Sequence, residues 1–161
     1  MASKFEIRRQ YAGSHISRTF TGVVDRGLAL GPDDSDPTVA VVATGTKFLG
    51  FLTRPVTALG STLEDAVYPG RLEGPFKSGG EVTLEKADEV EVEGELANAG
   101  LLNTSGTGAI TALTSIGTGL SFYNGKLRQA QGGEEVFYRL SGVLTPLEDV
   151  TNIRILAEIV R

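Results

Sequence analysis

The 161-residue chain contains no cysteine, no tryptophan and a single histidine, His15. The lack of cysteine excludes disulfides, thiolate zinc sites, cysteine nucleophiles and cysteine-bound iron–sulfur clusters. A metal site built on His15 would have no second imidazole, and no other side chain has an ordinary pKa near neutrality. We therefore predict no catalytic residue, no cofactor and no metal site, and we expect a protein that is not an enzyme.

Long apolar runs are missing too. The chain has no stretch of about 18 consecutive apolar residues, and residues 1–6 are not followed by the apolar segment of a secretion signal. Hydrophobic residues make up 40% of the chain and charged residues 22%, as in ordinary globular proteins. The composition predicts one folded domain that neither crosses a membrane nor is secreted.

Glycine, by contrast, is abundant: 21 glycines separate short apolar segments. Several segments alternate in the manner of strands, most clearly near the C-terminus, where Ile155 and Ala157 share one side and Arg154 and Glu158 the other. Shorter alternations occur at 136–140, 82–84 and 90–92. Segments 38–43 and 47–52 are apolar almost throughout, which predicts central strands that are covered on both faces.

Turn residues divide the chain into pieces too short for long helices. Asn124 and Gly125 both tolerate positive φ, which predicts a two-residue hairpin joining 120–123 to 126–128. Short helices are expected only at 61–64, which has capping-box spacing, and at 107–113. The predicted fold is all-β: a compact sandwich or small barrel of short antiparallel strands with at most one or two short helices.

Charge is unevenly distributed along the chain. The net charge is -5 and the sequence pI is about 4.9, the wrong overall sign for a protein that binds a phosphate backbone. Residues 1–30 contain five cations and two carboxylates, a balance of +3, whereas residues 81–95 contain seven carboxylates and one lysine, a balance of -6. We expect protein partners and no nucleic acid.

The acidic segment 89–95 has carboxylates at a spacing that could suit a catalytic site. Carboxylates at alternate positions of a strand lie roughly 6.6 Å apart, which overlaps the spacing of about 6.5–9.5 Å between the acid and base of inverting glycosidases. Side chains along one exposed face are solvated alike, so nothing separates their pKa values into an acid and a base. The favoured interpretation is a solvated acidic outer face, and glycoside hydrolysis remains the enzymatic alternative.

Three other motifs lack the full pattern of a site. Residues 33–36 offer three aspartates to a cation such as calcium, but Pro37 follows where a calcium loop needs glycine, so a solvated turn is favoured. The glycine pairs at 106–108 and 117–119 lack the spacing of phosphate-binding loops. His15 lies in an alternating segment, where a surface or packing role is favoured over catalysis.

The first twelve residues allow two interpretations, either an extended arm or the first strand of the β domain that occupies 13–161. An arm could add to the edge strand of a neighbouring protein while its apolar side chains fill pockets, and its arginines could meet an acidic surface. The acidic strand of a neighbouring copy is one such surface. The candidate protein-interface residues are Phe5, Ile7, Arg8, Arg9, Tyr11, Glu89, Glu91 and Glu93.

Five segments within residues 50–130, about half the chain, resemble those of head decoration (cement) proteins of tailed bacteriophages. They are Gly50-Phe51-Leu52-Thr53-Arg54-Pro55-Val56, Val67-Tyr68-Pro69-Gly70-Arg71, Gly79-Gly80-Glu81-Val82-Thr83-Leu84-Glu85-Lys86, Ile116-Gly117-Thr118-Gly119-Leu120 and Asn124-Gly125-Lys126-Leu127-Arg128-Gln129-Ala130.

The resemblance implies a structural virion protein without enzyme activity. Such a protein binds the major capsid protein on the outer surface of the shell, often as a homotrimer, after assembly in the host cytoplasm. Two alternatives stay open: a phage tail or baseplate protein, and a carbohydrate-binding β module. The second would normally present tryptophan or clustered tyrosines, and this chain has no Trp and four Tyr.

Overall fold

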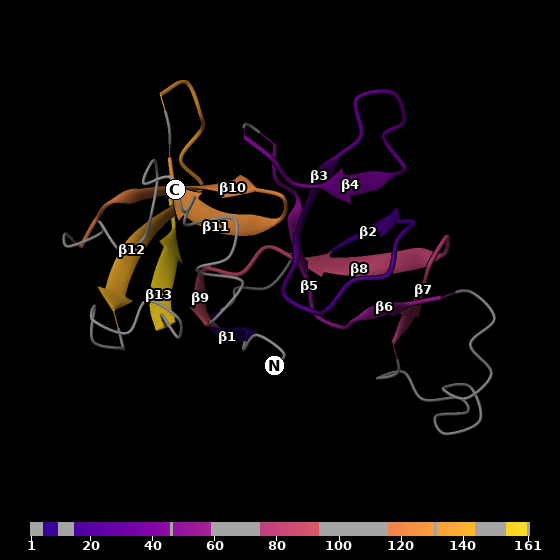
Figure 1. The fold of residues 1–161 in the computed structure, drawn as a ribbon, viewed down its shortest axis with the longest axis horizontal. Coiled ribbons are helices and arrows are strands. Elements are labelled where there is room, and N and C mark those ends of the chain that lie inside the picture. The colour runs from indigo at the N-terminus through magenta and orange to yellow at the C-terminus, as the bar shows by residue number, and fades with distance from the viewer. Residues whose placement is uncertain are drawn as a thin grey trace.

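The computed structural model describes residues 5–9, 15–45, 47–58, 75–93, 116–130, 132–143 and 154–160. These residues form thirteen short strands and no helix (Figure 1). The all-β class is confirmed, with a compact sandwich-like arrangement of sheets rather than a closed barrel. The segments 61–64 and 107–113, where short helices were expected, lie outside the described residues.

One sheet has six antiparallel strands in the order β1-β9-β13-β12-β10-β11 and occupies the left half of Figure 1. Its central strands come from the segments with the clearest alternation, so that Ile155 and Ala157 of β13 are fully buried. The prediction for the C-terminal strand is confirmed. The strands are β1 (Phe5–Arg9), β9 (Glu89–Glu93), β10 (Gly119–Tyr123), β11 (Lys126–Gln129), β12 (Tyr138–Val143) and β13 (Arg154–Ile159).

The second sheet has five antiparallel strands in the order β2-β8-β5-β3-β4. A parallel pair, β6 (Val56–Thr57) and β7 (Phe76–Lys77), lies beside it. One isolated bridge joins Thr19 to Val39, so the first and last strands touch at a single point while the sheet stays open. The strands are β2 (His15–Thr19), β3 (Ala29–Pro32), β4 (Ala40–Val42), β5 (Gly50–Leu52) and β8 (Glu81–Glu85).

The two apolar segments that were expected to be central strands have different positions. Strand β5 is central, and its three residues Gly50, Phe51 and Leu52 are all buried, as predicted. Strand β4 is an edge strand, and Val41 and Val42 are 39% and 37% exposed. The prediction of a central strand at 38–43 is therefore wrong, because an apolar run shows that side chains are apolar but not how many neighbours the strand has.

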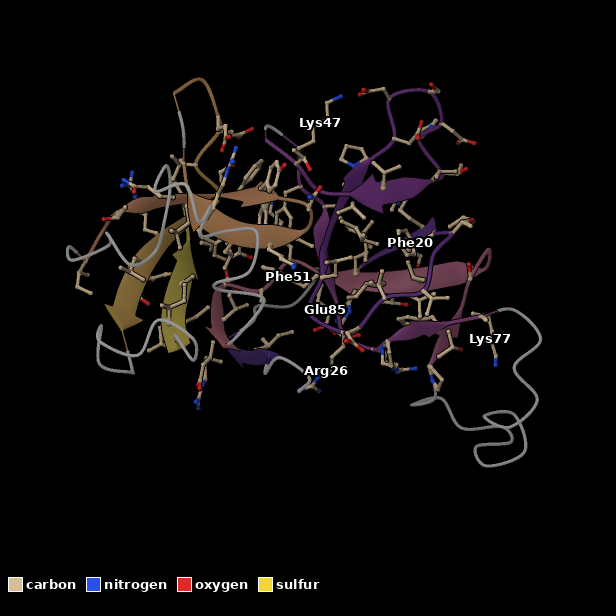
Figure 2. The ribbon with its side chains drawn as sticks, viewed as in Figure 1. Phe20, Arg26, Lys47, Phe51, Lys77 and Glu85 are labelled. Atoms are coloured by element: carbon tan, nitrogen blue, oxygen red, sulfur yellow. The ribbon has the colours of Figure 1, made fainter. Side chains whose placement is uncertain are left out.

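Two apolar clusters form the core. The first lies between the sheets, where Phe48 stacks on Phe122 with ring centroids 4.4 Å apart and meets Phe51 edge-on at 5.1 Å. The second covers the other face of the five-stranded sheet and contains Phe20, Leu52 and Leu84. Figure 2 shows Phe51 where the sheets meet. Burying one such side chain fully contributes about 1.5–3 kcal/mol to stability, so the first cluster holds the two sheets together.

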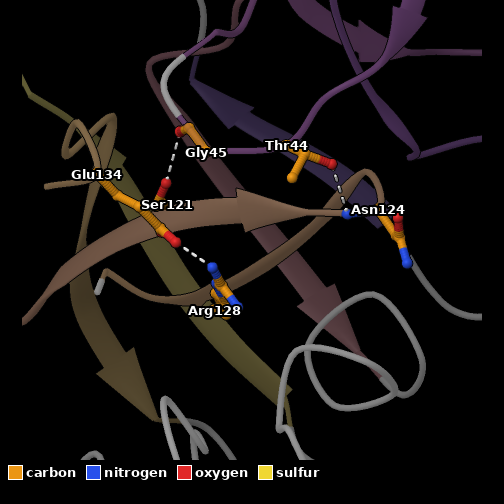
Figure 3. Close-up of polar contacts among 6 residues, drawn as sticks. All are labelled: Thr44, Gly45, Ser121, Asn124, Arg128 and Glu134. Carbon is orange, nitrogen blue, oxygen red and sulfur yellow. Dashed lines mark hydrogen bonds and ion pairs between the residues drawn. The ribbon is translucent and has the colours of Figure 1, made fainter. Parts of the chain in front are cut away.

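The hairpin between β10 and β11 also attaches the sheets through the backbone. Asn124 and Gly125 have φ of 49° and 77°, which confirms the predicted hairpin turn. Gly125 accepts a hydrogen bond from the amide of Ala29 and donates one to the carbonyl of Ala43, both 2.8 Å long. The Ser121 hydroxyl donates to Gly45 O at 2.9 Å, and the amide of Asn124 donates to Thr44 Oγ1 at 3.2 Å (Figure 3). The tip of the hairpin is thus bonded into the second sheet.

Candidate interaction site

The N-terminal segment forms a strand of its own chain. Strand β1 occupies one edge of the six-stranded sheet and pairs antiparallel with β9, with Phe5 opposite Val92 and Ile7 opposite Val90. Ile7 is partly buried against the core between the sheets. Residues 5–9 are therefore the first strand of the β domain in this structure and not an extended arm. Tyr11 lies outside the described residues.

A bulge interrupts this edge at Arg8. The register passes from Ile7 opposite Val90 to Arg9 opposite Glu89, so Arg8 is the extra residue. The Arg8 guanidinium forms an ion pair with the carboxylate of Glu91, with side chains that are 40% and 2% exposed. A buried carboxylate requires such a partner because desolvation penalises its charged form. Arg8 therefore contributes to the stability of its own sheet.

The expected acidic outer face is wrong at Glu91. This residue is buried and ion-paired, not solvated, whereas Glu89 on the same strand is half-buried. The backbone of Glu93 continues β9 opposite Arg154. The error arises because alternation places a residue on a face but does not say what the neighbouring strand brings to that face. Here β1 brings Arg8.

His15 begins the edge strand β2 and lies opposite Glu85 on β8. Its Nδ1 is 3.3 Å from Glu85 Oε1, and the two side chains are 59% and 18% exposed. An exposed pair of this kind contributes at most about 1 kcal/mol. The histidine therefore has an exposed position on a strand, beside the carboxylate of Glu85.

The aspartate-rich turn at 33–36 uses carboxylate oxygens to hold its own backbone. Asp33 Oδ1 accepts hydrogen bonds from the amides of Ser35 and Asp36 at 2.7 and 3.1 Å. Asp36 Oδ1 accepts from the hydroxyl and amide of Thr38 at 2.7 and 2.9 Å, and these bonds lower the pKa of Asp36 below its ordinary value. Within the described ranges, no three acidic or imidazole groups are placed to hold a metal ion.

Two further polar groups are engaged in the fold. The hydroxyl of Tyr138 donates a 2.6 Å hydrogen bond to the carbonyl of Ala87, and burial raises the pKa of Tyr138 far above its ordinary value. Arg128 forms an ion pair with Glu134 (Figure 3). Its guanidinium carbon lies 4.7 Å from the centre of the Tyr123 ring. The sequence did not predict the contacts of Arg128 with Glu134 and Tyr123, because these residues come together only when β10, β11 and the following turn are folded.

Of the two glycine pairs compared with phosphate-binding loops, the structure describes only the one at 117–119. The pair at 106–108 lies outside the described residues. Gly117 has φ of 93° and its amide donates a 2.7 Å hydrogen bond to the carbonyl of Leu140. A phosphate-binding loop directs its amides toward a ligand, whereas this amide belongs to a turn that joins β12.

Exposed apolar side chains form the remaining candidate surface. Five large hydrophobic residues of the described chain are substantially exposed, and two of them are adjacent on the edge strand β4. The apolar run at 38–43 predicted a covered strand, so nothing in the sequence indicated that this pair is exposed. The five residues are Val23, Val41, Val42, Ile116 and Tyr123.

Comparison with known proteins gives no relative. No protein-family model, no curated protein and no solved structure matches the chain. In the part of the chain that the structure describes, no helix has the length and apolar character needed to span a bilayer.

Proposed function

We propose that the chain is a structural virion protein that binds the outer surface of a phage capsid and stabilises the shell by bridging neighbouring subunits. The observation that supports this proposal is the interlocked pair of sheets. Segments that resemble decoration proteins supply β5, β8 and the β10–β11 hairpin, which are the elements at and beside the junction. The resemblance therefore covers the hairpin side of the junction, whereas the hairpin's backbone partners Ala29 and Ala43 lie outside the resembling segments.

A protein that bridges two subunits must keep its shape under load. The β10–β11 hairpin meets this requirement. Gly125 at its tip forms backbone hydrogen bonds with Ala29 and Ala43, and Phe122 of β10 packs on Phe48. Backbone hydrogen bonds and close-packed aromatic rings resist shear better than a flexible linker would. The two sheets can thus act as one unit between two attachment points.

The partners in this proposal are the major capsid protein and further copies of the chain, in a homotrimer on the capsid surface. Binding through residues 5–9 would require β1 to leave β9, with loss of the Ile7 contact and the Arg8 ion pair with Glu91. We therefore place the main capsid contact on other parts of the surface.

Co-sedimentation tests this function. The purified chain is mixed with expanded capsids of the encoding phage that lack it, and capsids saturated beforehand provide the control. The proposal expects saturable binding and greater resistance of the shell to heat. Absence of binding, or binding to purified tails instead of capsids, would overturn it.

A further inference from the structure

Asn124 is the one asparagine of the chain that a glycine follows, whereas the others precede alanine, threonine or isoleucine. Asn-Gly pairs deamidate faster than other asparagine pairs, because glycine has no side chain to keep its amide nitrogen from the asparagine side chain. The chain therefore places its most reactive side-chain amide at the tip of the hairpin that is bonded into the second sheet.

Deamidation of this pair consumes only water and releases ammonia. The backbone nitrogen of Gly125 loses its proton and bonds to Cγ of Asn124, while the bond from Cγ to Nδ2 breaks and Nδ2 leaves as ammonia. Water then opens the resulting succinimide ring. Breaking the new bond to Cγ gives aspartate, whereas breaking the bond to the backbone carbonyl carbon gives isoaspartate, whose main chain is one carbon longer.

The folded chain keeps the attacking nitrogen out of this reaction. Gly125 is buried, and its amide donates a 2.8 Å hydrogen bond to the carbonyl of Ala43. Asn124 itself is exposed, and its side chain points away from Thr44 (Figure 3). A buried amide in a hydrogen bond does not give up its proton to solvent until the bond opens. The reactive side chain is thus accessible, and the closed backbone protects it.

The contacts that hold the tip are few. Besides the bond to Ala43, the carbonyl of Gly125 accepts a 2.8 Å bond from the amide of Ala29, and the amide of Asn124 donates a 3.2 Å bond to Thr44 Oγ1. Neither residue of the tip belongs to the two apolar clusters. Segments with few buried apolar contacts open at a lower free energy than the whole domain. The tip therefore opens while both clusters stay packed.

The product is important at this position because the turn has only two residues. Asn124 and Gly125 have φ of 49° and 77°, and the pairing of Tyr123 with Lys126 closes the hairpin around them. Aspartate suits the same turn. Isoaspartate lengthens the main chain between the two residues, which displaces the Gly125 amide from the carbonyl of Ala43.

We propose that Asn124 and Gly125 form a deamidation site that the junction of the sheets keeps closed. The site reacts when the tip of the hairpin leaves the second sheet, and isoaspartate formed there prevents the tip from bonding again to Ala29 and Ala43. Each opening of the junction thus risks a covalent change that is not reversed by closure. The site does not depend on what the chain binds.

The rate of deamidation at Asn124 tests the protection. The unmodified chain is incubated at one pH and temperature in buffer and in unfolding concentrations of urea, and mass spectrometry follows the exchange of the side-chain amide for a carboxyl group. We expect the folded chain to react about 100-fold more slowly, or slower still. Equal rates would overturn the protection, and no reaction in urea would overturn the site.

A pair of variants separates opening of the tip from unfolding of the domain. Thr44→Val removes the acceptor of the Asn124 amide, and Thr57→Val is the matched control, because its hydroxyl donates a 3.3 Å bond to Phe76 O away from the hairpin. We expect Thr44→Val to deamidate about threefold to tenfold faster than the unmodified chain, and Thr57→Val to keep its rate. Equal acceleration in both variants, or none in Thr44→Val, would overturn opening at the tip.

Hydrogen exchange of the Gly125 amide gives a second measure that needs no variant. Its opening free energy should be lower than the free energy of unfolding in urea, and equal values would contradict local opening.

The effect of isoaspartate is tested against Asn124→Asp, which has the same composition and charge but a normal main chain. Chain aged in urea is refolded, and the isoaspartate form is separated by chromatography. We expect this form to unfold at a lower urea concentration than Asn124→Asp. Equal midpoints would show that the longer main chain is accommodated and would overturn that part of the proposal.

Discussion

The amide of Gly125 donates a 2.8 Å hydrogen bond to the carbonyl oxygen of Ala43, which joins the tip of one sheet to the other. Gly125 has φ of 77°, and a Cβ atom added there would lie 2.6 Å from the side chain of Leu28. Both observations require glycine at this position, one through backbone conformation and one through space. This part of the junction therefore requires a residue without a side chain.

Gly125→Ala is expected to destabilise the protein by about 2–4 kcal/mol, because left-handed backbone strain and overpacking against Leu28 add together. Gly79→Ala is the matched control, since Gly79 has φ of 85° but no atom within 4 Å of an added Cβ. It should lose only about 1 kcal/mol from the backbone term. Urea unfolding measures both, and equal losses would show that the contact with Leu28 is unimportant.

The ion pair of Arg8 with Glu91 should show a coupling free energy of about 1–2 kcal/mol in a double-mutant cycle with alanine. This value is below that of a fully buried pair because Arg8 is 40% exposed. The pair of Lys47 with Asp34 is the control, since both side chains are largely exposed, and its coupling should be below about 0.5 kcal/mol. A coupling no larger for Arg8 than for Lys47 would contradict this account.

Tyr138→Phe should cost about 1–2 kcal/mol at neutral pH, because the buried carbonyl of Ala87 loses its donor. The variant should also change how the free energy of unfolding depends on pH in the alkaline range. The raised pKa of Tyr138 keeps the folded phenol protonated, so its contribution is complete below the ordinary pKa of about 10 and falls as pH rises above it. The free energy of unfolding, measured from pH 8 to 11, should therefore fall less steeply with pH in Tyr138→Phe than in the unmodified chain. Parallel slopes would refute the assignment.

Thr38→Val should raise the pKa of Asp36 toward its ordinary value, because the hydroxyl bond is the largest cause of the lowering. A lowered carboxyl pKa stabilises the turn above the ordinary value, and that contribution is lost as pH falls through the folded pKa. Titration of the carboxyl carbon by NMR measures the shift. Ser35→Ala is the control, because it leaves both Thr38 bonds in place and should not change the pKa of Asp36. An unchanged pKa of Asp36 in Thr38→Val would contradict the prediction.

Local patterns were sufficient for several elements. Alternation located β13 and the Val82 and Leu84 core positions of β8, and the Asn124–Gly125 pair located the hairpin, because side-chain periodicity and the tolerance of positive φ are properties of neighbouring residues. The same patterns could not place Glu91 in a buried ion pair or show that β4 is an edge. Both depend on which distant strand lies beside the one considered.

The sequence by itself determined an all-β chain of short strands, a hairpin at residues 124 and 125, and the absence of thiol chemistry. Only the tertiary structure decided that Arg8 meets Glu91, that the hairpin is bonded to Ala29 and Ala43, and that β4 is left exposed. The physical reason is that strand order arises from contacts between segments far apart in the chain, and composition and periodicity carry no information about that order.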